Sequence, residues 1–184
     1  MGNQFVAMEK EAVNANFNSK LKIFTPETAD RIIFSLGNPS DVLLEVGIEN
    51  KPLKLYGSKL LKKIKKHSFN AVDLMNFPKA IADPIAIFEG NRAGSFSILT
   101  EIVIDNNNIF AIIETGKGQD ASFNVITSAY RKSNEQISNW INEGKMLYSN
   151  KEKALDYFNS PASIAGAQSN QEQTLAKQPR VRNM

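Results

Sequence analysis

Three consecutive strand-forming segments constrain the fold of this chain more than any other feature. They are "FSILTEIVID" (96–105), "IFAIIETG" (109–116) and "SFNVITSAYR" (122–131), and all are rich in β-branched and aromatic residues. A run of asparagines separates the first two segments, which is a turn signal between strands. Because short connections join antiparallel neighbours, we expect these segments to form a meander in an antiparallel sheet.

Helical patterns and two further strands precede the meander. Thr25-Pro26-Glu27 is a helix-start signal, and Gly37 ends the predicted helix. The apolar run at 41–48 predicts a strand, and the segment 58–66 predicts an amphipathic helix. A second strand is expected within "DPIAIFEG", between Pro84 and Gly90.

Two more helices are expected on either side of the strands. Ser68 is the predicted N-cap of a helix that Pro78 interrupts or restarts. The segment 133–160 also has helical spacing, with a break at Gly144. Its apolar stripe, which we expect in the core, consists of Ile137, Trp140 and Ile141.

This order of elements predicts an α+β fold, with N-terminal helices packed on a mainly antiparallel β-sheet and a C-terminal helix. Residues 21–158 are expected to form a single α+β domain. The first 20 residues have little periodicity and are interpreted as a flexible segment. Residues 159–184 are poor in large apolar side chains, which favours a disordered tail or linker.

Composition excludes several classes of site. The 184 residues contain no cysteine and one histidine, so thiolate or histidine-rich metal sites and cysteine nucleophiles are excluded. No glycine-rich phosphate loop or acidic metal-binding loop is present, so we expect neither a metal nor a cofactor. No run of about 18 apolar residues occurs, so we expect no membrane partner.

A lysine-rich segment is the first candidate for binding. Residues 51–66 contain seven lysines and no acidic residue. Four of them share one side of the predicted helix by three- and four-residue spacing: Lys59, Lys62, Lys63 and Lys66. Like charges at this spacing repel, so the cluster indicates either an anion-binding face or an ordinary solvated helix face.

Polar residues at His67 and 126–132 are candidates for chemistry. An imidazole titrates near neutral pH, so His67 is either a proton-transfer group beside the lysines or a helix-terminal capping residue. In "ITSAYRK" (126–132), Ser128 and Tyr130 could hydrogen-bond a phosphate or a base, and Arg131 could offset developing negative charge. The alternative is an edge strand with one buried tyrosine. Glu101 and Glu114 are weaker candidates for a general base.

The order of these features resembles a known family. The sequence has "LYGSKLLKKIKKH", "DLMNFPKAIADPIAIFEG", "ILTEIVID", "ITSAYRK" and then "ISNWINEGKMLYSNKEKA". Over about 26–158 this resembles the C-terminal domain of phage MuF-type minor head proteins and related domains of phage polyvalent proteins. These families are similar to the barnase/EndoU/colicin/RelE-like nuclease superfamily.

The resemblance implies a metal-independent endoribonuclease, an effector or toxin domain from a phage or mobile element. His67 would be the acid–base residue, Ser128 and Tyr130 would match the family's Ser-x-Tyr positions, and lysines would bind phosphate. The implied partner is RNA (tRNA is one candidate) or another nucleic acid, together with an immunity or phage-head protein. The expected location is the bacterial cytoplasm after delivery, or the virion. The alternative is a non-catalytic phage-head or nucleic-acid-binding module.

Overall fold

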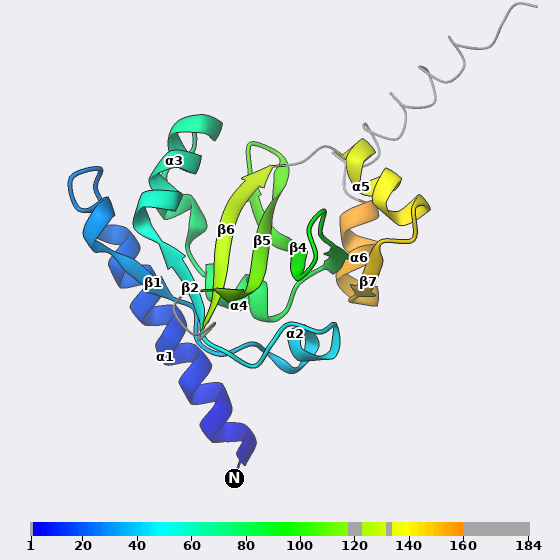
Figure 1. The fold of residues 1–184 in the computed structure, drawn as a ribbon, viewed down its shortest axis with the longest axis horizontal. Coiled ribbons are helices and arrows are strands. Elements are labelled where there is room, and N and C mark those ends of the chain that lie inside the picture. Colours follow the sequence, from blue (N-terminus) through cyan, green and yellow to red (C-terminus); the bar gives the residue numbers. More distant parts are fainter. Residues whose placement is uncertain (1, 118–122, 132–133, 160–184) are drawn as a thin grey trace, which may run out of the picture.

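The computed structural model describes residues 2–117, 123–131 and 134–159 (Figure 1). In this part of the chain, seven strands form one sheet in the order β1-β2-β6-β5-β4-β3-β7. All neighbours are antiparallel except β2 and β6, which are parallel. The strands are β1 (Ile33–Ser35), β2 (Leu53–Tyr56), β3 (Ala86–Glu89), β4 (Ser95–Ile104), β5 (Asn107–Lys117), β6 (Phe123–Arg131) and β7 (Met146–Ser149).

Helices precede and follow this sheet, which confirms the predicted α+β fold. The α-helices are α1 (Gly2–Lys22), α2 (Asp41–Glu45), α3 (Gly57–His67), α4 (Phe77–Ala82), α5 (Asn134–Asn142) and α6 (Lys151–Phe158), and the 3-10 turns are η1 (Ala29–Arg31) and η2 (Ala71–Leu74). No helix in the described part of the chain is long and apolar enough to span a membrane.

The predicted meander is present as β4, β5 and β6. Asp105 and Asn106 form the turn between β4 and β5, and both have a positive φ, of 50° and 63°. A two-residue turn with positive φ at both positions matches the twist of the strands it joins. Asparagine and aspartate tolerate this conformation better than most residues, so the polar sequence at this point fixes the register of the hairpin.

The two faces of the sheet carry separate apolar cores. One face holds Ile126, Ala111 and Ile98, which pack in the same cluster as Phe17 of α1 and Leu60 of α3. We call this side the inner face. The opposite face, here called the outer face, carries a smaller cluster against α5 and α6: Ile85, Ala86, Phe88, Leu99, Phe110, Ile137, Trp140 and Tyr157. The predicted core stripe of the C-terminal helix is therefore confirmed, with Ile137 and Trp140 buried and Ile141 half-buried.

The prediction of a helix from Thr25 is wrong. One 3-10 turn forms at Ala29–Arg31, and the chain then extends as β1. The Phe34 ring lies 5.1 Å from that of Phe17 and 5.8 Å from that of Phe24. These aromatic contacts and the pairing of β1 with β2 come from distant segments, so local helix signals could not reveal them.

The prediction of a strand at 41–48 is also wrong, because this segment contains α2. Leu43 and Ile48 are both buried, and Gly47, with φ of 103°, ends the helix. A short apolar run fits a buried helix as well as a strand, so periodicity alone did not separate the two.

Two further expectations near the helices are wrong, and a third is confirmed. Ser68 is the left-handed C-cap of α3 rather than an N-cap, and Asn70 caps η2. The segment 133–160 contains the edge strand β7 between α5 and α6. The predicted helix at 58–66 is confirmed as α3.

Helix α1 occupies most of the segment that was expected to be flexible. The helix could not be predicted from its sequence, because its amphipathic pattern is weak. Phe17 and Leu21 are nevertheless buried in the inner core. Helix α1 also contacts β1 and α4. The domain boundary at residue 21 stays a prediction, and the predicted tail lies outside the described residues except for Asn159.

Gly57, at the junction of β2 and α3, has no room for a side chain. A Cβ atom there would overlap the Ala29 carbonyl oxygen and lie 2.9 Å from that of Ile32. The Gly57 N–H donates a hydrogen bond to the same Ile32 oxygen, at 2.8 Å. The start of α3 is therefore held directly against the backbone of the η1–β1 segment.

We predict that Gly57→Ala lowers the free energy of unfolding by about 1–3 kcal/mol, because backbone atoms must move to admit the methyl group. Urea denaturation followed by circular dichroism measures this change. Ser58→Ala, one residue further along the same helix, is the control and should stay within about 0.5 kcal/mol of the unmodified protein. Equal stability of the two variants would contradict the close approach at Gly57.

Candidate nucleic-acid interface

Helix α3 stands beside the C-terminal half of β6. Strand β2 pairs with β6 only at Leu53↔Asn124 and Lys54↔Val125, and it ends at Tyr56. Strand β6 continues to Arg131, and α3, which starts where β2 stops, contacts it. Figure 1 shows α3 and the arrowhead of β6 at the same end of the molecule. The helix with the predicted lysine face therefore flanks the strand with the predicted Ser-x-Tyr motif.

The two sides of α3 differ sharply in polarity. Leu60 is buried in the inner core and Ile64 packs against it. Lys59, Lys62 and Lys66 are exposed, and Lys63 is half-buried. None of the ion pairs found among the described residues includes these four lysines. The predicted lysine face is thus confirmed as a surface of α3, although its role in binding stays a prediction.

Three of these lysines form a line of mutually repelling charges. Burial lowers the pKa of Lys63, and the positive charges of Lys66 and Lys59 lower it further. The three residues are one turn apart along the helix, so we call them the lysine line: Lys59, Lys63 and Lys66. A phosphate placed along the line would relieve this repulsion, because it supplies the opposite charge.

His67 is the last residue of α3 and directly follows the lysine line. It is half-buried and interacts with other residues. Ser68 then turns the chain with φ of 53° and ends the helix. This position at a helix terminus fits both interpretations of the histidine, capping and proton transfer.

The backbone register of β6 divides its three candidate residues between the two faces of the sheet. Ser128 is opposite Ile112 and Tyr130 is opposite Phe110, which belongs to the outer core with Trp140. Arg131 is opposite Ile109, which belongs to the inner core. Directly paired residues occupy the same face of a sheet, so Ser128 and Tyr130 hold outer-face positions and Arg131 an inner-face position.

A register shift in β6 alters the predicted alternation. Ile126 pairs with Ile113, while Ser128 pairs with the next residue, Ile112, which leaves Thr127 as an extra residue. Strict alternation had grouped Ile126 with Ser128 and Tyr130. The register separates them, because Ile126 lies in the inner core. No local sequence signal marks this irregularity.

The outer face next to Ser128 and Tyr130 carries three further polar or aromatic residues. In β2, Leu53 and Leu55 are buried on the inner face, so Lys54 and Tyr56 belong to the outer face, and both are half-buried. Glu114 pairs with Val125, which in turn pairs with Lys54, so all three lie in one row across β5, β6 and β2. Lys54, Tyr56 and Glu114 each already interact with other groups of the protein.

Tyr56 was not singled out from the sequence. The alternation of "LKLY" at 53–56 contains the signal, since period-2 spacing places Lys54 and Tyr56 together on one face. No element was predicted between Pro52 and Gly57, and only the pairing of β2 with β1 and β6 identifies the strand.

The family model of the phage MuF C-terminal domain matches residues 58–156. This chain belongs to the MuF C-terminal domain family. The match begins in α3 and ends in α6, so it includes the lysine line, His67 and all of β6. No curated protein and no solved structure matched the chain.

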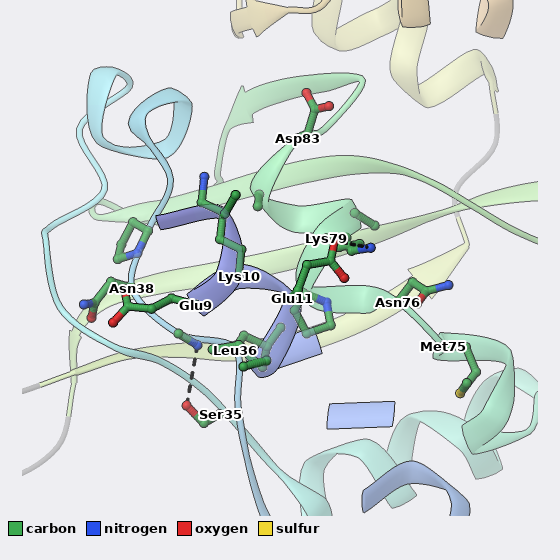
Figure 2. Close-up of a pocket in the computed structure, with 18 of the residues that line it drawn as sticks. Glu9, Lys10, Glu11, Ser35, Leu36, Asn38, Met75, Asn76, Lys79 and Asp83 are labelled. Carbon is green, nitrogen blue, oxygen red and sulfur yellow. Dashed lines mark hydrogen bonds and ion pairs between the residues drawn. The ribbon is translucent and has the colours of Figure 1, made fainter. Parts of the chain in front are cut away.

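A hollow lies elsewhere on the chain, between the N-terminal half of α1, the segment 35–39 and α4 (Figure 2). Its volume is about 1080 Å³. Lys79 pairs with Glu11 at 2.7 Å, and Lys153 pairs with Glu101 at 3.0 Å. Because opposite charges are paired around it, the hollow offers less attraction to an anion than α3 does.

Glu101, one of the two candidates for a general base, is already engaged in an ion pair with Lys153. Burial opposes the charged form of Lys153, but hydrogen bonds to Asp83 and Glu101 outweigh it and raise the pKa of the lysine. Glu101 therefore acts as an ion-pair partner that ties β4 to α6. Among the described residues, no group of three or more histidine, aspartate and glutamate side chains could hold a metal ion.

The lysine line of this MuF C-terminal domain can be tested by its electrostatics. We predict that Lys66→Gln raises the pKa of Lys63 towards its ordinary value, because one of the two repelling charges is removed while burial remains. Lys65→Gln, on the same helix but outside the line, should change it less. Side-chain NMR titration of the labelled lysine amines measures both variants. An equal shift in the two would show that the line is wrongly assigned.

Proposed function

We propose that this MuF C-terminal domain binds RNA along α3 and cleaves it without a metal ion, with His67 as an acid–base residue. The observation that carries the proposal is the position of α3. This helix, which carries the lysine line and ends at His67, contacts β6, the strand that contains Ser128 and Tyr130. Cationic side chains and a titratable imidazole beside one strand are the groups that phosphodiester chemistry needs.

The reaction would be an internal transfer at phosphorus. A base takes the proton from a ribose 2′-hydroxyl, and the 2′-oxygen then forms a bond to the adjacent phosphorus. The bond from phosphorus to the 5′-oxygen breaks, and an acid gives that oxygen a proton. The products are a 2′,3′-cyclic phosphate and a free 5′-hydroxyl, so atoms and protons balance without an external reagent.

Roles for individual residues follow from their positions. His67 would serve as the base or the acid, because imidazole exchanges protons near neutral pH. Lys59, Lys62, Lys63 and Lys66 would hold the phosphates, and Arg131 would offset charge from the inner-face side of β6. Ser128 and Tyr130 would contact the scissile phosphate from the outer face. Glu114, also on the outer face, is the second acid–base candidate.

A second candidate function is a non-catalytic nucleic-acid-binding module of a phage particle. The lysine line favours it specifically, because repelling charges on an exposed helix suit phosphate binding whether or not cleavage follows. In that case His67 would be a structural residue at the end of α3. The two candidate functions differ in what they require: cleavage needs His67 and the ribose 2′-hydroxyl, whereas binding alone needs neither.

Cleavage is tested with a fluorescent RNA oligonucleotide in EDTA, and with a DNA strand of the same sequence as substrate control. We expect the RNA alone to be cut, since DNA lacks the attacking hydroxyl, and we expect products that end in a 2′,3′-cyclic phosphate. His67→Ala should reduce the rate by about 10²–10⁴-fold, the contribution of one acid–base group. Mass spectrometry identifies the new ends, and circular dichroism checks the fold of the variant.

Other outcomes separate the two candidates. Salt-sensitive RNA binding without cleavage would reject the ribonuclease and support the binding module. Cleavage that persists in His67→Ala would remove this residue from the mechanism. Replacing Lys59, Lys63 and Lys66 together with glutamine should flatten the salt dependence of binding to a single strand. The expected change in slope is about 0.7 for each phosphate that is no longer neutralised.

A further inference from the structure

We infer that Tyr56 stacks on a nucleobase at the start of the lysine line, so that this surface takes single-stranded RNA in preference to duplex RNA. The inference rests on the proposed RNA binding by α3 and adds to it a base-contacting residue and a substrate class. Tyr56 and the lysine line are adjacent in the fold, because β2 leads into α3 without a loop.

The position of Tyr56 is fixed by its neighbours. The buried residues Leu53 and Leu55 face the inner core, and this alternation places Tyr56 on the outer face. Gly57 follows at once, and its close approach to the carbonyl oxygens of Ala29 and Ile32 leaves little freedom for the backbone at this junction. A stacking residue on a fixed strand loses little conformational entropy when it binds.

An apolar neighbour extends the aromatic surface. Ile33 in β1 is directly opposite Tyr56 in the antiparallel register, and it is 47% exposed. Apolar atoms make up a large part of any protein surface, so this exposure is ordinary, but it leaves the Ile33 side chain accessible beside Tyr56. A nucleobase is a flat, largely apolar ligand, and it could contact the ring of Tyr56 and the side chain of Ile33 together.

The charges of α3 continue from this aromatic position. Tyr56 is the N-cap residue of α3, and Lys59, Lys63 and Lys66 follow at successive turns. From residue 56 to residue 66 the helix rises about 15 Å. At about 3.4 Å per nucleotide in a stacked strand, this length corresponds to roughly four nucleotides. The line therefore offers phosphate contacts over a short strand whose first base lies at Tyr56.

A single strand fits this arrangement better than a duplex. In duplex RNA the bases are stacked inside the helix, and proteins read it through its shape and its sugar–phosphate surface. An aromatic residue on a sheet can stack only with an unpaired base. Lysines alone would bind both forms, so the preference between them depends on Tyr56.

The test uses matched tyrosine variants and a ligand that stays intact. A ten-nucleotide 2′-fluoro RNA lacks the attacking hydroxyl, and its affinity is measured by fluorescence anisotropy. We expect Tyr56→Leu, which keeps apolar bulk without an aromatic ring, to weaken binding by about 5- to 150-fold. Tyr56→Phe should bind like the unmodified protein. Tyr148→Leu, at the β7 edge of the sheet, is the control and should have no effect.

Two further ligands separate base stacking from an indirect effect on the fold. A strand of the same length with abasic sites should bind the unmodified protein and Tyr56→Leu equally, because no base remains to stack. The annealed duplex should bind more weakly than the single strand to the unmodified protein, and Tyr56→Leu should bind it with unchanged affinity. The salt dependence should also be unchanged in Tyr56→Leu, since the lysines still neutralise the phosphates.

Several results would overturn the inference. Binding of Tyr56→Leu within two-fold of the unmodified protein would exclude stacking, and the proposed RNA binding would stand if the lysine variant still bound more weakly. An equal weakening on the abasic strand would show that Tyr56 acts through the fold. Equal affinity of the unmodified protein for duplex and single strand would remove the preference. Absence of any RNA binding would overturn both this inference and the proposed function.

Discussion

The close contact between Gly57 and the backbone of the η1–β1 segment is the constraint on which the candidate interface depends. It sets where β2 stops and where α3 begins. Because β2 stops early, α3 instead of a strand flanks β6 beyond its pairs with β2 at Asn124 and Val125. A helix in that place carries several cationic side chains on one side at three- and four-residue spacing.

The separation of the inner and outer cores leaves the outer face of β2 and β6 available. Helices α1 and α4 and the inner side of α3 bury one face of the sheet, while α5 and α6 cover the other face mainly over β3, β4 and part of β5 (Figure 1). Strands β2 and β6 therefore carry polar residues on the outer face. The extra residue at Thr127 then decides which positions of β6 belong to the same face as Tyr56.

The sequence predicted the elements whose signals are local. The meander, α3, the core role of Trp140 and the lysine face were all predictable, because spacing and turn residues report directly on them. The segments at 25–48 were predicted wrongly, since Phe34 and Leu43 take their structure from distant partners. For the site, the register shift at Thr127 and the outer-face position of Tyr56 could not be predicted, because both depend on strand pairing.

The sequence by itself determined the chemical inventory of this MuF C-terminal domain. It has one imidazole, no thiol, and a helix whose lysines lie on one side. Tertiary structure alone decided which of these groups are neighbours. Hydrogen bonding between strands far apart in the chain sets β6 beside β2, and the absence of space at Gly57 sets α3 beside β6. Such contacts depend on long-range packing, which local periodicity does not encode.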